Sequence, residues 1–157
     1  MIITHNDFMT PIVDKLNDLF DNLKTDDKMK NTYESNVVVG DIWDSVNLLN
    51  VDFDGKEEFF KWMLGYSHLI SLSILRQLDY KYIHFVDYID GEMLIHNHEH
   101  AEHYCALIYL NDTGSTVFDD TTVESKVGRV VQFPAHANHS SPKSQGKRVL
   151  VLGYKYK

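Results

Sequence analysis

The 157 residues, 43% hydrophobic and 24% charged, predict one soluble domain (residues 1–157) that is large enough to bury a hydrophobic core. The net charge of −8 argues against binding to nucleic acid or to an anionic membrane, because no basic patch can neutralise phosphates. The lone cysteine, Cys105, excludes an internal disulfide, and the absence of a membrane-length apolar run or a signal-peptide pattern favours a cytoplasmic location.

The first half of the chain has helical periodicity. Thr10-Pro11 is a typical helix start, with threonine as the cap and proline at the first helical position. The apolar residues that follow recur at helical spacing: Ile12, Val13, Leu16, Leu19, Phe20 and Leu23. Residues 36–43 favour a short strand, and residues 56–79 give the strongest helical pattern. Residues 1–79 are therefore expected to form a helical buttress.

From residue 80 onward the pattern is that of strands and turns. The expected strands are residues 82–88, 93–98, 104–110, 115–118, 128–133 and 148–156. Turn-forming residues separate several of them, as in the Asn111-Asp-Thr-Gly114 stretch. We therefore expect a mainly β fold, in which a compact β core of residues 80–157 packs against the N-terminal helices.

Six of the nine histidines fall in two clusters at the ends of expected strands. In the first cluster, His96, His98, His100 and Glu102 share parity, so an extended segment would point all four to one side. Neutral imidazole is the commonest metal ligand in proteins, and this arrangement predicts a metal centre. Two other interpretations are a polar histidine-rich loop and an inverted zinc-protease helix, which would need a long helix at His96 to His100.

The second cluster supplies a distant ligand. His139 follows a buried-strand pattern and a short turn, and a basic residue, Arg148, stands nine positions later. His136 lies nearer the strand and is expected at the rim of the site. Cys105 lies inside an apolar strand and is expected in the core. His5, His68 and His84 have no partners nearby in the sequence, and we expect structural or surface roles for them.

The ordered set of motifs in residues 82–157 resembles the iron(II)- and 2-oxoglutarate-dependent dioxygenases, and most closely their prolyl-hydroxylase-like branch. The matching segments are Tyr109-Leu-Asn111, Gly114-Ser-Thr116-Val-Phe118, Gly128-Arg-Val-Val-Gln-Phe133, His139-Ser-Ser-Pro and Gly146-Lys-Arg148-Val-Leu-Val. The resemblance implies a double-stranded β-helix (jelly-roll or cupin-like) core with helices packed outside. It also implies a hydroxylase that uses Fe(II) and the cosubstrate 2-oxoglutarate.

Carried over by position, His139 resembles the distal iron ligand, and Arg148 resembles the residue that pairs with the far carboxylate of 2-oxoglutarate. Tyr109 resembles the tyrosine that adds a hydrogen bond to that carboxylate. The first ligand pair of the family is His-x-Asp or His-x-Glu, within a 2-His-1-carboxylate triad. Here the sequence departs from the family, because the spacing favours His96 with His98. The other registers are His98 with His100, and His100 with Glu102, which alone keeps a carboxylate.

Two alternatives share the architecture. A cupin-type metalloprotein would use His96, His98, Glu102 and His139 as four ligands, and a non-catalytic jelly-roll binding protein would explain the missing aspartate. The expected partner is a small-molecule or peptidyl substrate, not nucleic acid or membrane, and the sequence gives no oligomeric state.

Overall fold

The computed structural model describes residues 2–31, 36–74, 78–98 and 103–157, with backbone only for residues 68–74. Its two α-helices are α1 (Val13–Thr25), preceded by a 3-10 turn at Thr10–Ile12, and α2 (Lys56–Ile74). The strands are β1 (Ile3–His5), β2 (Met29–Asn31), β3 (Val38–Ser45), β4 (Leu78–His96), β5 (Tyr104–Tyr109), β6 (Ser115–Phe118), β7 (Thr122–Glu124), β8 (Val130–Pro134), β9 (His139–Ser144) and β10 (Lys147–Tyr156). No helix among these residues is long and apolar enough to cross a membrane.

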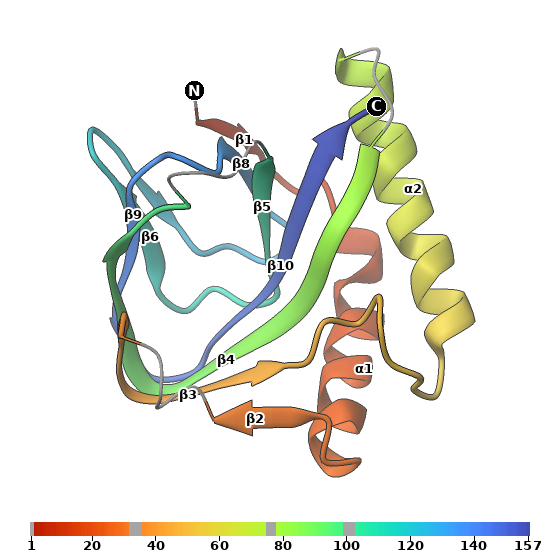
Figure 1. Ribbon diagram of the computed structural model, residues 1–157, viewed down its shortest axis with the longest axis horizontal. Coiled ribbons are helices and arrows are strands. Elements are labelled where there is room, and N and C mark those ends of the chain that lie inside the picture. Colours follow the sequence, from red (N-terminus) through yellow and green to blue (C-terminus); the bar gives the residue numbers. More distant parts are fainter. Residues whose placement is uncertain (1, 32–35, 75–77, 99–102) are drawn as a thin grey trace.

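The strands form one antiparallel sheet that curls back on itself (Figure 1). Its order is β1-β8-β5-β10-β4-β9-β6-β7, and β3 and β2 extend it beside β4. The long strand β4 joins the two walls, because its first half pairs with β10 and its second half pairs with β9. Two separately expected strands, residues 82–88 and 93–98, are thus parts of one strand that bends between the walls.

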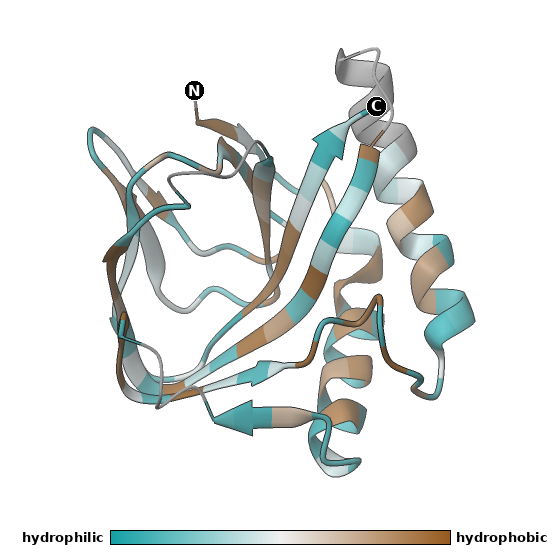
Figure 2. Ribbon diagram, viewed as in Figure 1, coloured by the Kyte–Doolittle hydropathy of each residue, from teal (hydrophilic) through white to brown (hydrophobic). Residues whose placement is uncertain are grey.

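Side-chain parity divides the interior into two cores. On β4, Ile83 and Phe85 point toward the helices, whereas Val86 and Tyr88 belong to the core inside the curled sheet. The same alternation runs along β5 and β10, where Ile108 and Leu150 face the helices. In Figure 2, β5 and the middle of β10 are hydrophobic, as expected for strands that are covered on both faces.

The helices α1 and α2 cover the outer face of the wall formed by β4 and β10 (Figure 1). Leu16, Phe20 and Leu23 of α1 are buried there, which confirms the apolar face expected from their spacing. A polar cluster also joins α1 to the sheet: the Lys24 ammonium lies 2.7 Å from the buried Asp87 carboxylate, and the Arg148 guanidinium lies 2.9 Å from Asp21. This arrangement fixes the helical layer against one face and leaves the other face free to form a site.

The N-terminal region contributes more than helices. β1 pairs with β8, and β3 pairs with β4 over Val38 to Asp44, so this region also extends the sheet. The strand expected at residues 36–43 is present with its bounds shifted to Val38–Ser45. Helix α2 ends earlier than its sequence pattern suggests, because Leu78 already belongs to β4.

Candidate metal centre and pocket

A cavity of about 420 Å³ lies inside the curled sheet. Its walls are mainly apolar and come from both halves of the fold, including Ile42, Val86, Leu107, Phe133 and Val149. Polar side chains are placed at separate positions around it: His96, His98 and His139; Lys147 with Thr116 and Ser141; and Lys30, Asp44 and His84. A largely apolar concave site with a few convergent polar groups is the usual form of a small-molecule pocket.

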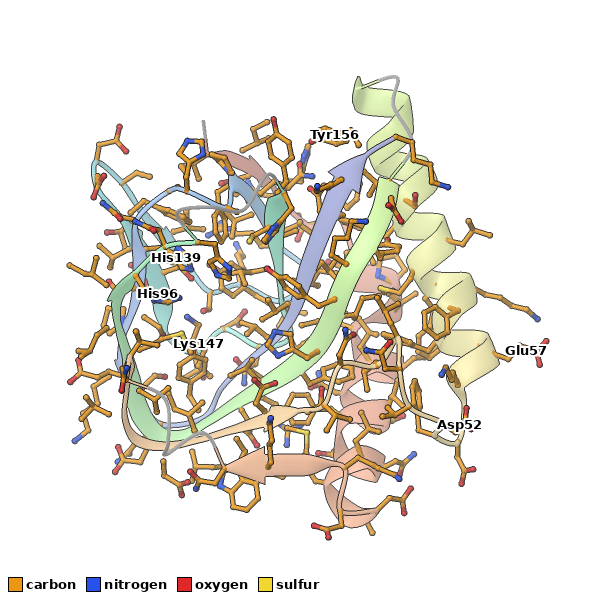
Figure 3. All side chains as sticks on the ribbon, viewed as in Figure 1. Asp52, Glu57, His96, His139, Lys147 and Tyr156 are labelled. Atoms are coloured by element: carbon orange, nitrogen blue, oxygen red, sulfur yellow. The ribbon has the colours of Figure 1, made fainter. Side chains whose placement is uncertain are left out.

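Three of the predicted metal ligands come together on this cavity. His96 ends β4 and pairs directly with His139, which begins β9. Their ring centroids are 4.3 Å apart, and the His98 ring lies 6.3 Å from His96 and 6.4 Å from His139. The His98 backbone N–H donates to the Ala135 carbonyl (2.9 Å), which holds this segment beside the turn that precedes His139. Figure 3 shows His96 and His139 side by side.

The hydrogen bonds of two of these rings leave metal-binding nitrogens available. Nδ1 of His96 lies 2.7 Å from the Leu94 carbonyl oxygen, and Nδ1 of His139 lies 2.9 Å from that of Ala137. A carbonyl oxygen only accepts, so Nδ1 carries the hydrogen and Nε2 keeps its lone pair. Burial lowers the pKa of His139 to about 4 and also lowers the pKa of His98, so both rings are neutral at pH 7.

The three imidazole rings line the same cavity, but they are not arranged around one common metal position. Within the described part of the chain, no three His, Cys, Asp or Glu side chains have the geometry that holds a metal ion. His100 and Glu102, which complete the other two registers and the cupin ligand set, lie outside the described residues. His136 is exposed and is not part of the cavity wall.

Lys147 is a buried cation in the cavity wall, and the sequence reasoning did not identify it. Its side chain is among the largest fully buried ones, and it donates to the Ser115 carbonyl (2.6 Å), the Ser141 hydroxyl (2.9 Å) and the Thr116 hydroxyl (3.4 Å). All three acceptors are neutral, and no carboxylate among the described residues pairs with it. Burial lowers the pKa of Lys147 to about 7.

Aromatic side chains surround this ammonium. Lys147 Nζ lies 4.9 Å from the centre of the Tyr88 ring and 5.9 Å from that of Tyr109. The Tyr109 hydroxyl is 2.7 Å from the Thr116 hydroxyl, so the predicted residue Tyr109 reaches the lysine through Thr116. Burial raises the pKa of Tyr88 to about 12 and also raises that of Tyr109, which keeps both phenols protonated.

Arg148 does not lie where the sequence reasoning expected it. Its guanidinium packs 4.4 Å from the Phe20 ring and pairs with Asp21, on the helix side of the sheet. Adjacent residues of a strand face opposite sides, so β10 can direct only one of this pair into the cavity. Lys147 occupies the pocket side, and the expectation that Arg148 reaches the pocket is corrected.

A second polar cluster lies beside the histidines. The Tyr82 hydroxyl is 3.0 Å from Nε2 of His103 and 3.2 Å from the Cys105 sulfur, and the His103 ring lies 5.5 Å from His98. The Tyr82 ring crosses β10 at Gly153, where an added Cβ would come within 2.3 Å of it. Because Gly153 has no side chain, the Tyr82 ring can lie across β10 and reach His103 and Cys105. Cys105 is buried, as predicted, and burial raises the pKa of its thiol.

His84 was expected to be structural or superficial, but its side chain lines the cavity. It is hydrogen-bonded through Nδ1 to Asp44 of β3, and both side chains are only about a fifth exposed, at 24% and 22%. Sequence spacing gave no signal for this pair, because the two residues are 40 positions apart.

Comparison with solved structures identifies the fold. No family model matches the chain, and no curated protein matches it. Among solved structures, it is similar to a Pseudomonas putida prolyl-4-hydroxylase (14% identity, TM-score 0.71, covering 99% of this chain and 92% of that one). It is also similar to a prolyl hydroxylase from Trichoplax adhaerens (14% identity, TM-score 0.75, covering 98% and 82%).

A third likeness is weaker. A predicted oxalate decarboxylase from Thermotoga maritima is 11% identical with a TM-score of 0.51, covering 80% of this chain and 90% of that one. The prolyl hydroxylase likeness also includes nearly all of this chain. The chain therefore has the fold of these prolyl hydroxylases, a double-stranded β-helix with N-terminal helices packed outside, and this confirms the fold predicted from its sequence.

Proposed function

We propose that the protein is an Fe(II)- and 2-oxoglutarate-dependent oxygenase that hydroxylates a small-molecule or peptidyl substrate. The observation that carries this proposal is Lys147, a buried ammonium without a carboxylate partner in the described residues, on the same cavity as three gathered imidazoles. A buried cation is costly unless an anion pairs with it. The unpaired lysine is therefore suited to an anionic ligand.

Lys147 would hold the far carboxylate of 2-oxoglutarate. Its bonds to the Ser115 carbonyl and the Ser141 hydroxyl fix the ammonium in place, and its third N–H, which makes only a long 3.4 Å bond to Thr116, would turn to the carboxylate. Tyr109 restrains Thr116 from behind, and this gives the tyrosine a positioning role instead of the direct hydrogen bond that the resemblance implies. Because the surroundings are buried and apolar, the attraction between ammonium and carboxylate is much stronger there than in water.

His96, His98 and His139 would hold the metal through small adjustments of their side chains. The donor set fits a divalent transition metal in kind, since neutral imidazoles with free Nε2 atoms bind such ions. The backbone carbonyls of Leu94 and Ala137 orient the rings of His96 and His139 through their Nδ1 hydrogens. Phe133, whose ring centre is 4.8 Å from that of His139, gives this end of the cavity an apolar wall.

When bound, iron supplies the oxidation, in which 2-oxoglutarate loses CO2 to become succinate, one atom of O2 enters succinate, and the other converts a substrate C–H into C–OH. The protein's contribution is to bind the cosubstrate carboxylate, orient the imidazoles and exclude water. The Trichoplax adhaerens structure contains a peptide fragment, which is consistent with a peptidyl substrate for this fold. A cytoplasmic location also remains part of the proposal.

Paired variants of adjacent residues test the function. Lys147→Met should weaken 2-oxoglutarate binding by about 2–5 kcal/mol, the usual cost of removing one partner of a buried charge pair, while Arg148→Met should leave it nearly unchanged. Calorimetry with 2-oxoglutarate measures both. Anaerobic Fe(II) together with 2-oxoglutarate should also give a weak visible charge-transfer band. Equal cosubstrate affinity in Lys147→Met and the parent would refute the assignment and favour the cupin alternative.

A further inference from the structure

The cavity has oppositely charged groups at two separate positions. Lys147 pairs with Tyr88 across the strands, and Val151 pairs with His84 four residues away on β4. At about 3.4 Å per residue, the two positions are roughly 14 Å apart along the strand. Apolar residues, including Val86 and Val149, lie between them. A ligand at the Lys147 end would thus leave the His84 end for a second molecule.

The His84 end is built around a carboxylate. Asp44 is the one Asp or Glu that lines the cavity in the described residues. Its Oδ1 accepts the Nδ1 hydrogen of His84, since a carboxylate only accepts. That bond orients the imidazole. In the neutral ring with its hydrogen on Nδ1, two acceptors, His84 Nε2 and Asp44 Oδ2, have no protein partner in the described structure.

Two free acceptors and a negative charge select for a cation that carries several N–H donors. Charge-assisted bonds to a carboxylate are about twice as strong as neutral ones, so a protonated amine fits better than an alcohol or an amide. The chain's net charge of −8 also attracts cations toward the opening. Lys30, opposite Asp44 on β2, is exposed and makes no ion pair with it. With no ion-pair partner among the described residues, its ammonium can meet an anionic group at the outer edge.

We propose that Asp44 and His84 bind the ammonium group of an amine substrate whose carbon chain extends along Val86, Leu107 and Val151 toward the histidines. The identity of the reaction rests on the proposed function, whereas the amine site rests only on Asp44, His84 and the cavity. The ammonium could belong to a free amino acid or to a lysine side chain of a peptide.

Calorimetry with isoamylamine, using the whole chain with and without 2-oxoglutarate, tests the site. Asp44→Asn should weaken amine binding by about tenfold to a hundredfold, the range expected for one hydrogen bond to a charged group. Isoamyl alcohol, which has the same carbon skeleton without the charge, should bind more weakly and lose nothing in this variant. Glu57→Gln is the matched control, because it removes the same charge from α2, outside the cavity (Figure 3).

No amine binding by the parent, or equal binding by Asp44→Asn, would overturn the inference. L-leucine and Nα-acetyl-lysine amide separate the two sources, since only leucine has a carboxylate beside its ammonium for Lys30 to pair with. Leucine affinity that falls in Lys30→Ala would support a free amino acid, and preferred binding of the lysine derivative would support a peptide. A protein that binds amines but not 2-oxoglutarate would retain this site and refute the proposed function separately.

Discussion

Replacing Lys147 with methionine should stabilise the ligand-free protein. The pKa of Lys147 is lowered by burial from 10.5 to about 7. At 1.36 kcal/mol per pKa unit, this shift corresponds to about 5 kcal/mol of lost stability when the unfolded lysine is charged. Methionine has a similar length and no charge, so it removes that cost. It also leaves the Ser115 carbonyl and the Ser141 hydroxyl without this donor, which costs about 1–3 kcal/mol.

The difference in stability between Lys147→Met and the parent should decrease as the pH rises. Below pH 7 the lysine is protonated in both states, and the full cost of the buried charge is present. Between pH 7 and about 10.5 the unfolded chain binds the extra proton, so the stability of the parent rises with pH. Above that range the cost is gone. The methionine variant should therefore exceed the parent by about 2–4 kcal/mol at pH 6–7 and lose this advantage by pH 10.

Urea denaturation between pH 6 and pH 10, followed by the fluorescence of Trp43 and Trp62, measures the difference. Lys143→Met is the control, because Lys143 is exposed and its substitution should leave the pH profile unchanged. A saturating concentration of 2-oxoglutarate should stabilise the parent but not the Lys147 variant. Parallel profiles for the parent and Lys147→Met would refute the view that Lys147 carries a destabilising buried charge.

Three further substitutions test other parts of the structure. Asp87→Asn should destabilise the fold by about 2–4 kcal/mol, because Lys24 and Arg148 lose a buried carboxylate, and urea denaturation would show whether α1 depends on it. Gly153→Ala should cost about 1–3 kcal/mol through overpacking against Tyr82, and a much smaller cost in a Tyr82→Ala background would identify the clash. His139→Ala should abolish metal binding in calorimetry while far-ultraviolet circular dichroism stays unchanged, and retained ferrous affinity would contradict its role as a ligand.

Much of the fold can be predicted from this sequence because the apolar residues that recur at helix or strand spacing are also the residues that are buried. The spacing of Leu16, Phe20 and Leu23 matches the buried face of α1. The family resemblance carried by the motifs after residue 80 implies a double-stranded β-helix, which agrees with the observed fold. Local pattern could not reveal that residues 78–96 form one strand, because the bend in β4 depends on pairing with β10 and β9, which come later in the chain. The contribution of β1 to the sheet is equally non-local.

The sequence predicts the histidines of the candidate site but not its basic residue. His96, His98 and His139 were identified because their clusters end strands, and the structure brings their rings to one cavity. The basic partner was misplaced by one residue, although Gly146-Lys-Arg148 contains both candidates. A shift of one residue along a strand reverses the face, and the shared motif does not fix the length of the turn before β10. The pairing of Lys147 with Tyr88 fixes that register in the structure and places the lysine, not the arginine, in the pocket.

Arg148 then has a different role, since it reaches Asp21 and Asp87 and helps to join α1 to the sheet. Exchanging the two residues, as Lys147→Arg with Arg148→Lys, would therefore disturb both the pocket and the helix contact, even though composition and net charge stay the same.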